Sequence, residues 1–382
     1  MSSLLDTATL APDEVYVDVA TSLRHLSIQR GSNNQSDALF HADTGTCVGL
    51  LDDRARAFDP LNSTDIRPMR ACQVVATWSS VAYELFTGFV ESWSMEYPAF
   101  AVDATTTASA VDGTFKLVNM NVTDNFTQQD TGARIEDLLG DCDWAAGTDI
   151  DTGLTLMPEH VGTVSGWQAV VEAADSEMGD VYVQADGIMR FRNRDTIIAE
   201  TRSNTSQATF GDSGVELPYH DIQISYDDQR IRNQITVAYN EAGNTVEVRD
   251  ADSINDYGLH QYTLQVQIVD RGTAANLAWF LLHLYRQPFV RIDGITLKPR
   301  ADALLWPAVL ARELGDLVTV KLTPPGGGSR ISREVFVRGI EYDIDADNDW
   351  TVRLTFQDAS LFYDPFLLDT SLLDSTTDLL WF

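Results

Sequence analysis

Apolar and polar residues alternate along the first third of the chain, with the period of two that half-buried strands produce. The alternating stretches are EVYVDVA, RHLSIQRG, TCVGLLDD, CQVVATW and VAYELFTGFVESWSMEY, followed by FAVDATTTASAV. They are rich in Val, Thr, Tyr, Phe and Trp, and Gly, Pro, Asn and Asp separate them. Ser79 and Ser80 lie where a tight hairpin is expected. The pattern predicts one antiparallel β-domain over residues 14–112, a barrel or a sandwich.

The spacing of apolar residues changes to that of helices after residue 113. A short helical pattern spans residues 131–144. A clearer one begins at Ser165, where a capping-box pattern is present, and is expected to end at Gly179. A hairpin with an Asp-Gly turn follows. Residues 113–217 are therefore predicted to form a small α+β domain.

Strand patterns return after residue 218, in DIQISYD, NQITVAYNE, NTVEVRD, HQYTLQVQIV, GDLVTVKLT, REVFVRGIEYDID and TVRLTFQ. One amphipathic helix is expected between Thr273 and Pro288. These patterns predict a second β-domain over residues 218–360 with one helix. The fold class is thus expected to be mainly β, with two barrel or sandwich domains flanking the α+β domain. Residues 1–13 and 361–382 are expected to be an N-terminal extension and a C-terminal docking tail.

The charge of the chain argues against one class of partner. The sequence has 26 Lys and Arg against 57 Asp and Glu, a net charge of −31 over 382 residues. Binding to a phosphate backbone requires Lys and Arg to replace counterions, so specific nucleic-acid binding is not expected. Cys47, Cys72 and Cys142 have no C-x-x-C spacing. They are predicted to be small core residues of a protein folded in a reducing compartment.

Three stretches carry side chains that could perform chemistry, and each has a simpler interpretation. FGDSGVE resembles the surroundings of a serine-protease nucleophile at Ser213, but no histidine motif accompanies it, so a Gly-rich linker is expected. DIDADNDW, residues 343–350, lacks the glycine and glutamate of a calcium loop, which favours a hairpin turn. LLDDRARAFDP, residues 50–60, is interpreted as a salt-bridged loop instead of a catalytic carboxylate pair. No catalytic, metal-binding or cofactor-binding residue is predicted, and the chain is not expected to be an enzyme.

Both ends of the chain are apolar, although the protein as a whole is acidic. Asp369, Asp374 and Asp378 interrupt the C-terminal run, which is therefore too short to span a bilayer. The N-terminus lacks the basic and apolar regions of a signal peptide. These ends either fold back on their own domain or dock in a groove of a partner. The predicted docking residues are Leu4, Leu5, Phe366, Leu367, Leu368, Leu372, Leu373, Leu379, Leu380, Trp381 and Phe382.

An ordered series of segments over roughly residues 14–360 resembles the minor tail or tail-tip (baseplate) hub proteins of long-tailed bacteriophages. The segments are LSIQRG, LLDDRARAFDPLN, RPMRACQVVATWSSVAYELFTGFVESW, TGARIEDLL, DIDTGL, DVYVQADGIMRFRNR, ISYDDQRIRNQITV, INDYGL, GDLVTVKLTPPGGG and VFVRGIEYDIDADNDWTVRLTF.

This resemblance implies two β-domains with the fold of the tail tube, and a homotrimer whose six β-domains join a six-fold tube to a three-fold fibre or spike. The expected partners are the distal tail or tube protein above and the fibre or spike protein below. DNA would pass only in transit, with no cofactor and no membrane span. The expected location is the tail tip of the virion, after assembly in the host cytoplasm. The alternatives are a hexameric distal-tail adaptor and, from another class, a tail-associated enzyme that degrades peptidoglycan.

Overall fold

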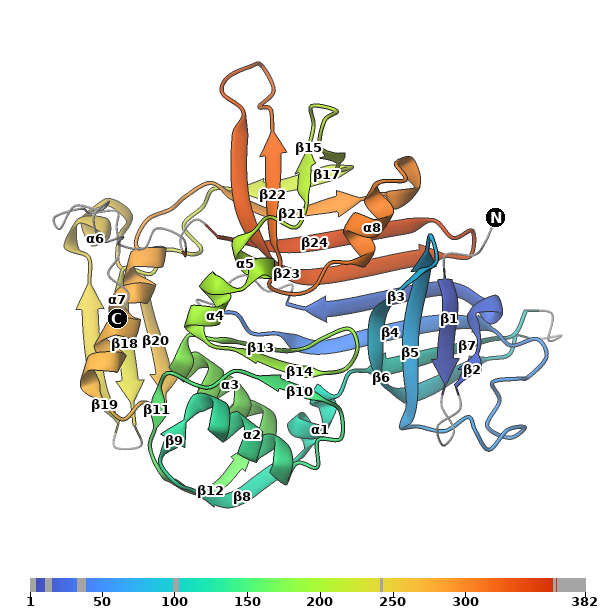
Figure 1. Ribbon diagram of the computed structural model, residues 1–382, viewed down its shortest axis with the longest axis horizontal. Helices are drawn as coiled ribbons and strands as arrows, with labels where there is room; N and C mark the ends of the chain where they lie inside the picture. The colour runs from blue at the N-terminus through green and yellow to red at the C-terminus, as the bar shows by residue number, and fades with distance from the viewer. Residues whose placement is uncertain are drawn as a thin grey trace.

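The first β-unit is formed by the N-terminal part of the chain (Figure 1, blue and cyan). The computed structural model describes residues 5–10, 16–32, 39–98, 103–240, 243–359 and 362. The elements of this unit are β1 (Leu5–Leu10), β2 (Val17–Asp18), η1 (Ala20–Ser22), β3 (Leu23–Gly31), β4 (Asp43–Asp52), β5 (Arg70–Trp78), β6 (Val81–Glu96) and β7 (Thr105–Val111). The strands pair antiparallel in the order β3-β4-β7-β6-β5-β1-β2. The predicted hairpin is confirmed, because Ser79 and Ser80 link β5 to β6 with left-handed φ angles.

The N-terminal segment belongs in part to this unit. Residues 1–13 were expected to precede the first strand as an extension, but Leu5–Leu10 pairs with β5 as strand β1. The alternation of LDTATL is short and weak, so its pairing with a distant strand could not be inferred from the local pattern.

The second β-unit is built from the C-terminal half of the chain (Figure 1, yellow-green for β15 to β17 and orange to red for β21 to β24). Its elements are β15 (Thr209–Gly211), β16 (Leu217–Pro218), β17 (Asp221–Ser225), β21 (Arg291–Leu297), η2 (Pro299–Ala301), α8 (Leu305–Leu310), β22 (Leu317–Leu322), β23 (Ile331–Asp345) and β24 (Trp350–Asp358). The strand order is β16-β15-β22-β23-β24-β21-β17. The two end strands, β16 and β17, follow each other in sequence, so this sheet nearly returns on itself.

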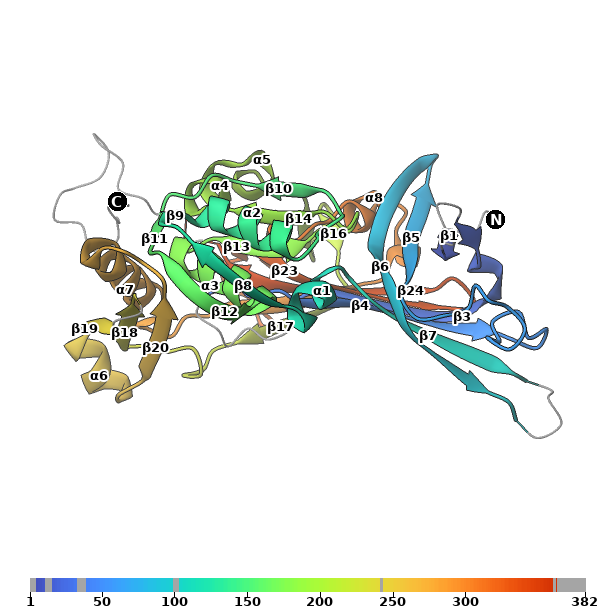
Figure 2. The ribbon, with the colours of Figure 1, turned by 90° about the horizontal axis from the view of Figure 1, so that it is seen from below.

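Pairing between β3 and β23 joins the two β-units into one sheet. Gly339–Asp345 of β23 pairs antiparallel with His25–Gly31 of β3, beyond the point where β22 stops pairing at Phe336. The other edge of β23 pairs with β24. Figure 2 shows β3, β4, β23 and β24 as one layer, with α8, β5 and most of the α+β domain on one side of it. The opposite side of this layer is called the open face below.

The two β-units have the same strand topology. Strands β3, β4, β5, β6 and β7 correspond in order and pairing to β17, β21, β22, β23 and β24. In each unit the fourth strand is the longest, with 16 residues in β6 and 15 in β23. Each also has a register shift at the same place, between Val90 and Ser92 in β6 and between Val337 and Gly339 in β23. One chain therefore contains two copies of one architectural unit.

The α+β domain lies between the β-units in sequence (Figure 1, green). It consists of α1 (Thr114–Asn119), β8 (Asn121–Phe126), β9 (Gln129–Asp130), α2 (Thr131–Asp141), β10 (Thr148–Ile150), β11 (Leu156–Met157), β12 (His160–Ser165), α3 (Gly166–Glu177), β13 (Asp180–Val183) and β14 (Met189–Arg192). Two short helices, α4 (Arg194–Ala199) and α5 (Thr201–Asn204), connect it to β15. Ser165 is the N-cap of α3 as predicted, but its side chain makes no capping hydrogen bond. The helix ends at Glu177, because the next residue, Met178, adopts the left-handed conformation one position before the predicted stop at Gly179.

A separate module interrupts the second β-unit. It contains β18 (Gln234–Tyr239), β19 (Asn244–Arg249), α6 (Ala251–Tyr257), β20 (Gln261–Val266) and α7 (Arg271–Tyr285). The strands form their own sheet, β19-β18-β20, and α7 packs on it with a hydrophobic core distinct from that of the β-units. The range 218–360 was expected to be one β-domain with one helix. Its described residues instead hold α6, α7 and α8 and two cores, which the local pattern of strands does not reveal.

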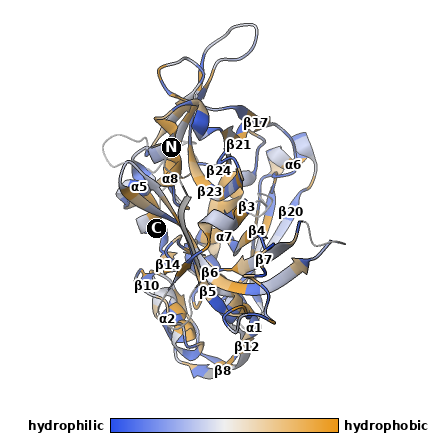
Figure 3. Ribbon diagram, turned by 90° about the vertical axis from the view of Figure 1, so that its right-hand side faces the viewer, coloured by the Kyte–Doolittle hydropathy of each residue, from blue (hydrophilic) through white to orange (hydrophobic). Residues whose placement is uncertain are grey.

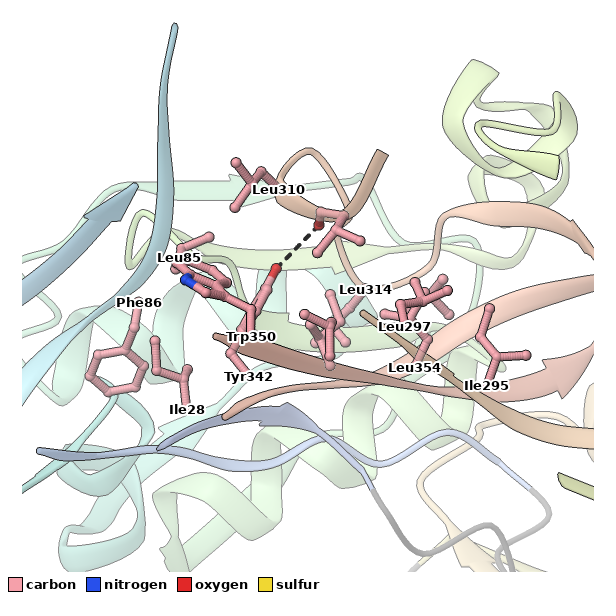
Figure 4. Close-up of a cluster of buried hydrophobic side chains, with 14 of the residues drawn as sticks. Ile28, Leu85, Phe86, Ile295, Leu297, Leu310, Leu314, Tyr342, Trp350 and Leu354 are labelled. Atoms are coloured by element: carbon pink, nitrogen blue, oxygen red, sulfur yellow. Dashed lines mark hydrogen bonds between the residues drawn. The ribbon is translucent and has the colours of Figure 1, made fainter. Parts of the chain in front are cut away.

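One hydrophobic core spans both β-units. Leu85 and Phe86 of the first unit and Leu354 of the second belong to the same buried cluster (Figure 4). At the boundary between the units, Trp306 of α8 stacks on Trp78 at 5.5 Å between ring centroids and meets Trp350 edge-on at 5.3 Å. Buried and less buried residues alternate along β24 and over much of β3, and Figure 3 shows both hydrophobic and hydrophilic segments in the joint sheet. The two units are thus one packed body.

Candidate functional site

The predicted docking residues lie almost entirely outside the described residues. Leu4 and the predicted docking residues from Phe366 to Phe382 are outside the described residues. Leu5 is described through its backbone, which pairs with Ala76 in β5. The backbone of Leu5 is thus part of the first β-unit, and a docking role for the ends now rests on the C-terminal residues.

The loop around Ser213 is a cluster of ion pairs. The Ser213 hydroxyl donates a hydrogen bond to Glu216. Arg330 donates to Glu216 Oε1 at 2.6 Å and to Asp212 Oδ1 at 3.1 Å. Arg330, followed by Ser213, lowers the pKa of Glu216 to about 2. Because these bonds hold the pKa of Glu216 low, its carboxylate is too weak a base to activate the Ser213 hydroxyl.

The carboxylates of residues 50–60 have separate structural partners, which confirms the predicted salt-bridged loop. Asp53 is fully buried and accepts hydrogen bonds from Phe58 N at 2.9 Å and Thr106 Oγ1 at 2.8 Å. Asp59 pairs with Arg56 in the same loop. These carboxylates hold the loop on the end of the first β-unit.

The stretch 343–350 is the predicted hairpin turn, between β23 and β24. Asp345 Oδ1 accepts hydrogen bonds from the N–H groups of Asp347 and Asp349, both at 2.9 Å. Asn348 has a φ of 57° and accepts a hydrogen bond from the indole of Trp350. Within the described ranges, no group of three or more His, Cys, Asp and Glu is arranged to hold a metal ion. No helix in the described part of the chain is long and apolar enough to span a membrane.

A buried polar cluster, called the junction cluster here, ties the three main parts of the protein together. Its members are Arg30 of the first β-unit, Asp180 and Arg192 of the α+β domain, and Glu313 and Arg338 of the second β-unit. Asp180 accepts from Arg338, and from Arg192 at 3.1 Å. Glu313 pairs with Arg30 and also accepts from the backbone N–H of Ala185 at 3.2 Å. Buried charges are tolerated when they are paired and hydrogen-bonded in this way.

The surroundings of the junction cluster leave little space for movement. Arg338 lies over the ring of Phe40 at 4.4 Å from its centroid. Burial raises the pKa of the adjacent Tyr182 to about 12, so this phenol stays neutral. Gly315 has a φ of +80°, and a Cβ there would be 1.9 Å from Arg192 Nη2. Glycine is required at position 315 because it adopts a positive φ without strain and has no Cβ to collide with the Arg192 guanidinium. The junction cluster therefore fixes the α+β domain against both β-units.

The joint sheet has two edges at which a further strand could pair. β17 pairs with β21 on one side and with no other described strand. The end of β6, from Ser92 to Glu96, pairs with β7 but extends beyond the first residue of β5, Arg70, which pairs with Val90. In the second unit, the equivalent part of β23 is the part that pairs with β3. The protein thus presents an exposed edge at each end of the sheet.

The open face of the joint sheet is polar. Arg353 of β24 donates to Glu341 of β23 at 3.0 Å, and His25 of β3 lies 3.2 Å from Asp343. The alternate residues of the same strands, including Ile340 and Tyr342, point into the core. The open face has charged groups of both signs, and most of the bulk of the protein lies behind it (Figure 2).

This architecture is similar to that of solved tail proteins. The chain is similar to the tail protein from Neisseria meningitidis MC58, with a TM-score of 0.62 at 14% identity over 93% of this chain and 97% of that one. It is also similar to the 43 kDa tail protein of prophage MuSo2 from Shewanella oneidensis, with a TM-score of 0.59 at 13% identity over 94% and 99% of the two chains. No protein-family model and no curated protein sequence matches the chain. The fold expected from the resemblance to tail proteins is confirmed.

Proposed function

We propose that this protein is a structural component of a phage tail, a hub at the tail tip that closes into a ring of three copies. The observation that carries the proposal is the duplication of the β-unit within one chain, with the two copies joined edge to edge by β3 and β23. A ring of six equivalent β-units made from three chains matches a six-fold tube on one side and a three-fold fibre or spike on the other. A hexameric adaptor needs only one such unit per chain, so the duplication favours the trimer.

The internal joint between the units provides a template for the contact between chains. Because β6 corresponds to β23 and β17 corresponds to β3, the same joint forms when β17 of one copy pairs with the end of β6 of the next. In the internal joint Ser27 faces Asp343. Carrying this register to the equivalent strands brings Gln223 of one chain opposite Glu96 of the next. Such pairing also protects both exposed edges from non-specific association.

Disulfide trapping tests this contact directly. Residues opposite each other in neighbouring strands have Cα atoms close enough for a disulfide. The double variant Gln223→Cys, Glu96→Cys is expected to form covalent dimers and trimers on oxidation of the assembled protein. The matched control pairs Glu96→Cys with Glu247→Cys on β19, which should remain monomeric on a denaturing gel. A trimer by mass photometry without the crosslink would reject the strand pairing but keep the ring; single chains under assembly conditions would reject the hub.

The open face is proposed to line the channel for DNA. The α+β domain and α8 lie behind the joint sheet, so a ring has room for them only on its outside (Figure 2). A surface with charges of both signs and a strongly acidic chain around it gives phosphates no cationic track to bind. The DNA would therefore pass without being held.

The C-terminal residues are proposed to dock on a neighbouring subunit or tail protein. The predicted anchors are the leucine pairs and Phe366, Trp381 and Phe382. Aromatic and leucine side chains in a groove are typical anchors of such contacts. Removal of residues 366–382 is expected to leave a folded chain with impaired assembly. An unchanged distribution of assembled masses would reject the docking role.

A structural role needs no catalytic group, and this proposal includes no enzymatic activity and no cofactor. The alternative of a peptidoglycan-degrading enzyme requires an activated nucleophile, a carboxylate pair or a metal. The carboxylates of the candidate loops at Ser213 and in residues 50–60 are already bonded to structural partners. The proposed location is the tail tip of the virion, beside tube and fibre proteins.

A further inference from the structure

Apolar side chains are exposed along both exposed edges of the joint sheet. On β17, Ile224 is 45% exposed and Tyr226 is 65% exposed. At the end of β6, Met95 is 36% exposed, and Tyr97, the residue that follows the strand, is 48% exposed. Edge strands that face water are commonly protected by charged side chains, so apolar residues on both edges point to a partner that covers them.

The internal joint between the β-units shows the same positions when an edge is covered. The pairing of the strands makes Ile224 of β17 equivalent to Ile28 of β3. It also makes Met95 of β6 equivalent to Tyr342 of β23. Ile28 and Tyr342 are fully buried, face each other across the joint and lie side by side in the core (Figure 4). Two positions that the internal joint buries are therefore exposed at the edges.

The correspondence extends to the next residues on the same side of the sheet. Tyr97 is equivalent to Ile344, which is buried in the internal joint opposite Leu26. Leu26 is in turn equivalent to Ile222 of β17, which is only partly buried. Each edge thus carries a row of apolar side chains on its core side, where the internal joint has a closed core.

The wall behind the edge of β6 is already in place. Residues 53–69 connect β4 to β5, as the segment with α8 connects β21 to β22. Phe58 of this loop stacks on Trp93 of β6 with 6.5 Å between ring centroids, and Trp93 Nε1 donates to Arg67 O at 3.2 Å. In the internal joint, Val309 O of α8 accepts a hydrogen bond from Tyr342 Oη at 3.3 Å. The loop therefore backs the edge of β6 as α8 backs the joint.

We propose that these side chains form an apolar seam between neighbouring copies of this chain. The seam rests on the ring proposed above and adds to its strand pairing the side chains that hold it. The register of the internal joint pairs Ile222 with Tyr97, Ile224 with Met95, and Tyr226 with Trp93. Aromatic and methionine side chains are enriched in the buried centres of protein interfaces. Because the two sides of the seam differ, it joins copies head to tail and not as a symmetric pair.

Single substitutions test the seam by sedimentation velocity on the purified full chain. Ile224→Asp and Met95→Asp each place a carboxylate in an apolar contact, so each is expected to weaken association more than tenfold and leave single chains. Gln223→Asp is the matched control. It is next to Ile224 on the same edge, but its side chain is on the open face with Glu341 and Arg353, so this variant should assemble like the natural protein.

A mixture of the two disrupted variants distinguishes a lost contact from a damaged fold. Chains with Ile224→Asp keep the natural side of the seam on β6, and chains with Met95→Asp keep the natural side on β17. One natural seam can therefore form between the two kinds of chain. The mixture is expected to contain dimers that neither variant forms alone.

The seam and the ring can fail separately in these measurements. Full assembly by all three variants, or natural trimers without dimers in the mixture, would overturn the seam and leave the ring. Natural assemblies that grow beyond three chains, together with mixed dimers, would keep the seam and reject the ring. Single natural chains at every concentration, with no dimers in the mixture, would reject both.

Discussion

Arg338 on β23 and Asp180 on β13 form an ion pair in which each side chain is only 5% exposed, although 158 residues separate them. The pair connects the second β-unit to the α+β domain, and Arg192 shares the same carboxylate. Two buried guanidinium groups thus share one acid, and Arg192 has a second acidic partner in Glu200 at 3.1 Å. The relative position of the two parts is fixed by charge as well as by packing.

Substitution of Asp180 by Asn should be strongly destabilising. It leaves Arg192 and Arg338 buried without their shared counter-charge, and loss of one partner of a buried ion pair typically costs about 3–5 kcal/mol. Urea unfolding measures the change. The control is Asp149→Asn, whose carboxylate pairs with Arg190 but is half exposed and should contribute less than about 1 kcal/mol. Similar effects of the two substitutions would contradict the role given to the junction cluster.

Trp306→Ala should loosen the boundary between the β-units. Trp306 is buried and contacts both Trp78 and Trp350, so its truncation leaves a cavity that typically costs about 3–5 kcal/mol. Trp279 on α7 is 58% exposed, and Trp279→Ala should change stability by less than about 0.5 kcal/mol. Thermal unfolding of both variants checks this contrast. Equal losses would show that the tryptophan stack does not hold the units together.

The ion pairs around Arg330 should contribute to stability only above acidic pH. The pKa of Glu216 falls from 4.5 to about 2 on folding, chiefly through Arg330, so the unfolded chain binds the proton more tightly. The contribution is present above pH 4.5 and is lost as the pH falls towards 2. The melting temperatures of the natural protein and Glu216→Gln, compared from pH 7 to pH 2, should therefore approach each other at the acidic end. A constant difference across this range would rule out the shifted carboxylate as the cause.

The three thiols should be unreactive in the folded protein. Cys47, Cys72 and Cys142 are free and buried, as the sequence predicted. Burial raises the pKa of each, to about 12 for Cys72, which removes the reactive thiolate at neutral pH. Ellman's reagent at pH 8 should label none of them until denaturant is added, and then all three. Fast labelling of Cys47 or Cys72 in the folded protein would indicate that the first β-unit opens, and fast labelling of Cys142 that the α+β domain opens. This inertness also makes the disulfide-trapping experiment selective for the introduced cysteines.

Positive charge on the open face should slow DNA transit if this face lines the channel. The change is Glu341→Lys with Asp343→Lys, on the strand that joins the two units. Lysines attract the phosphates that the natural surface does not hold. DNA ejection from particles that carry these substitutions should be slower and more sensitive to salt. Glu247→Lys on β19 is the control for added charge elsewhere, and an unchanged rate in both variants would place the channel on another surface.

The sequence predicts the local elements of this fold much better than their long-range pairing. The period-two stretches, the serine hairpin and the turn before Trp350 follow from local chemistry and are present. The joint between β3 and β23 brings together segments over 300 residues apart, and neither strand has a local feature that selects its partner.

The separate module and the junction cluster were missed for similar reasons. The strands β18, β19 and β20 have the same alternation as their neighbours, so their independent core is visible only in the fold. Arg192 and Arg338 occupy polar positions of strands that usually face solvent, and it is the packing of three parts that buries them. The local pattern also does not show which face of α7 is exposed: Trp279 lies on the face opposite the buried Leu277 and Leu281.

The duplication of the β-unit has a consequence for how successive copies would be oriented in the proposed ring. From β6 through β7, β4, β3, β23, β24 and β21 to β17, each strand runs opposite to its neighbour. This path has an even number of strands, so its two outermost strands point in opposite directions. A following copy can then add its β6 to β17 antiparallel, without reversing its own orientation. In the proposed ring, an even number of strands per chain allows all copies to have the same orientation along the ring axis. The two ends of the ring would then present different residues.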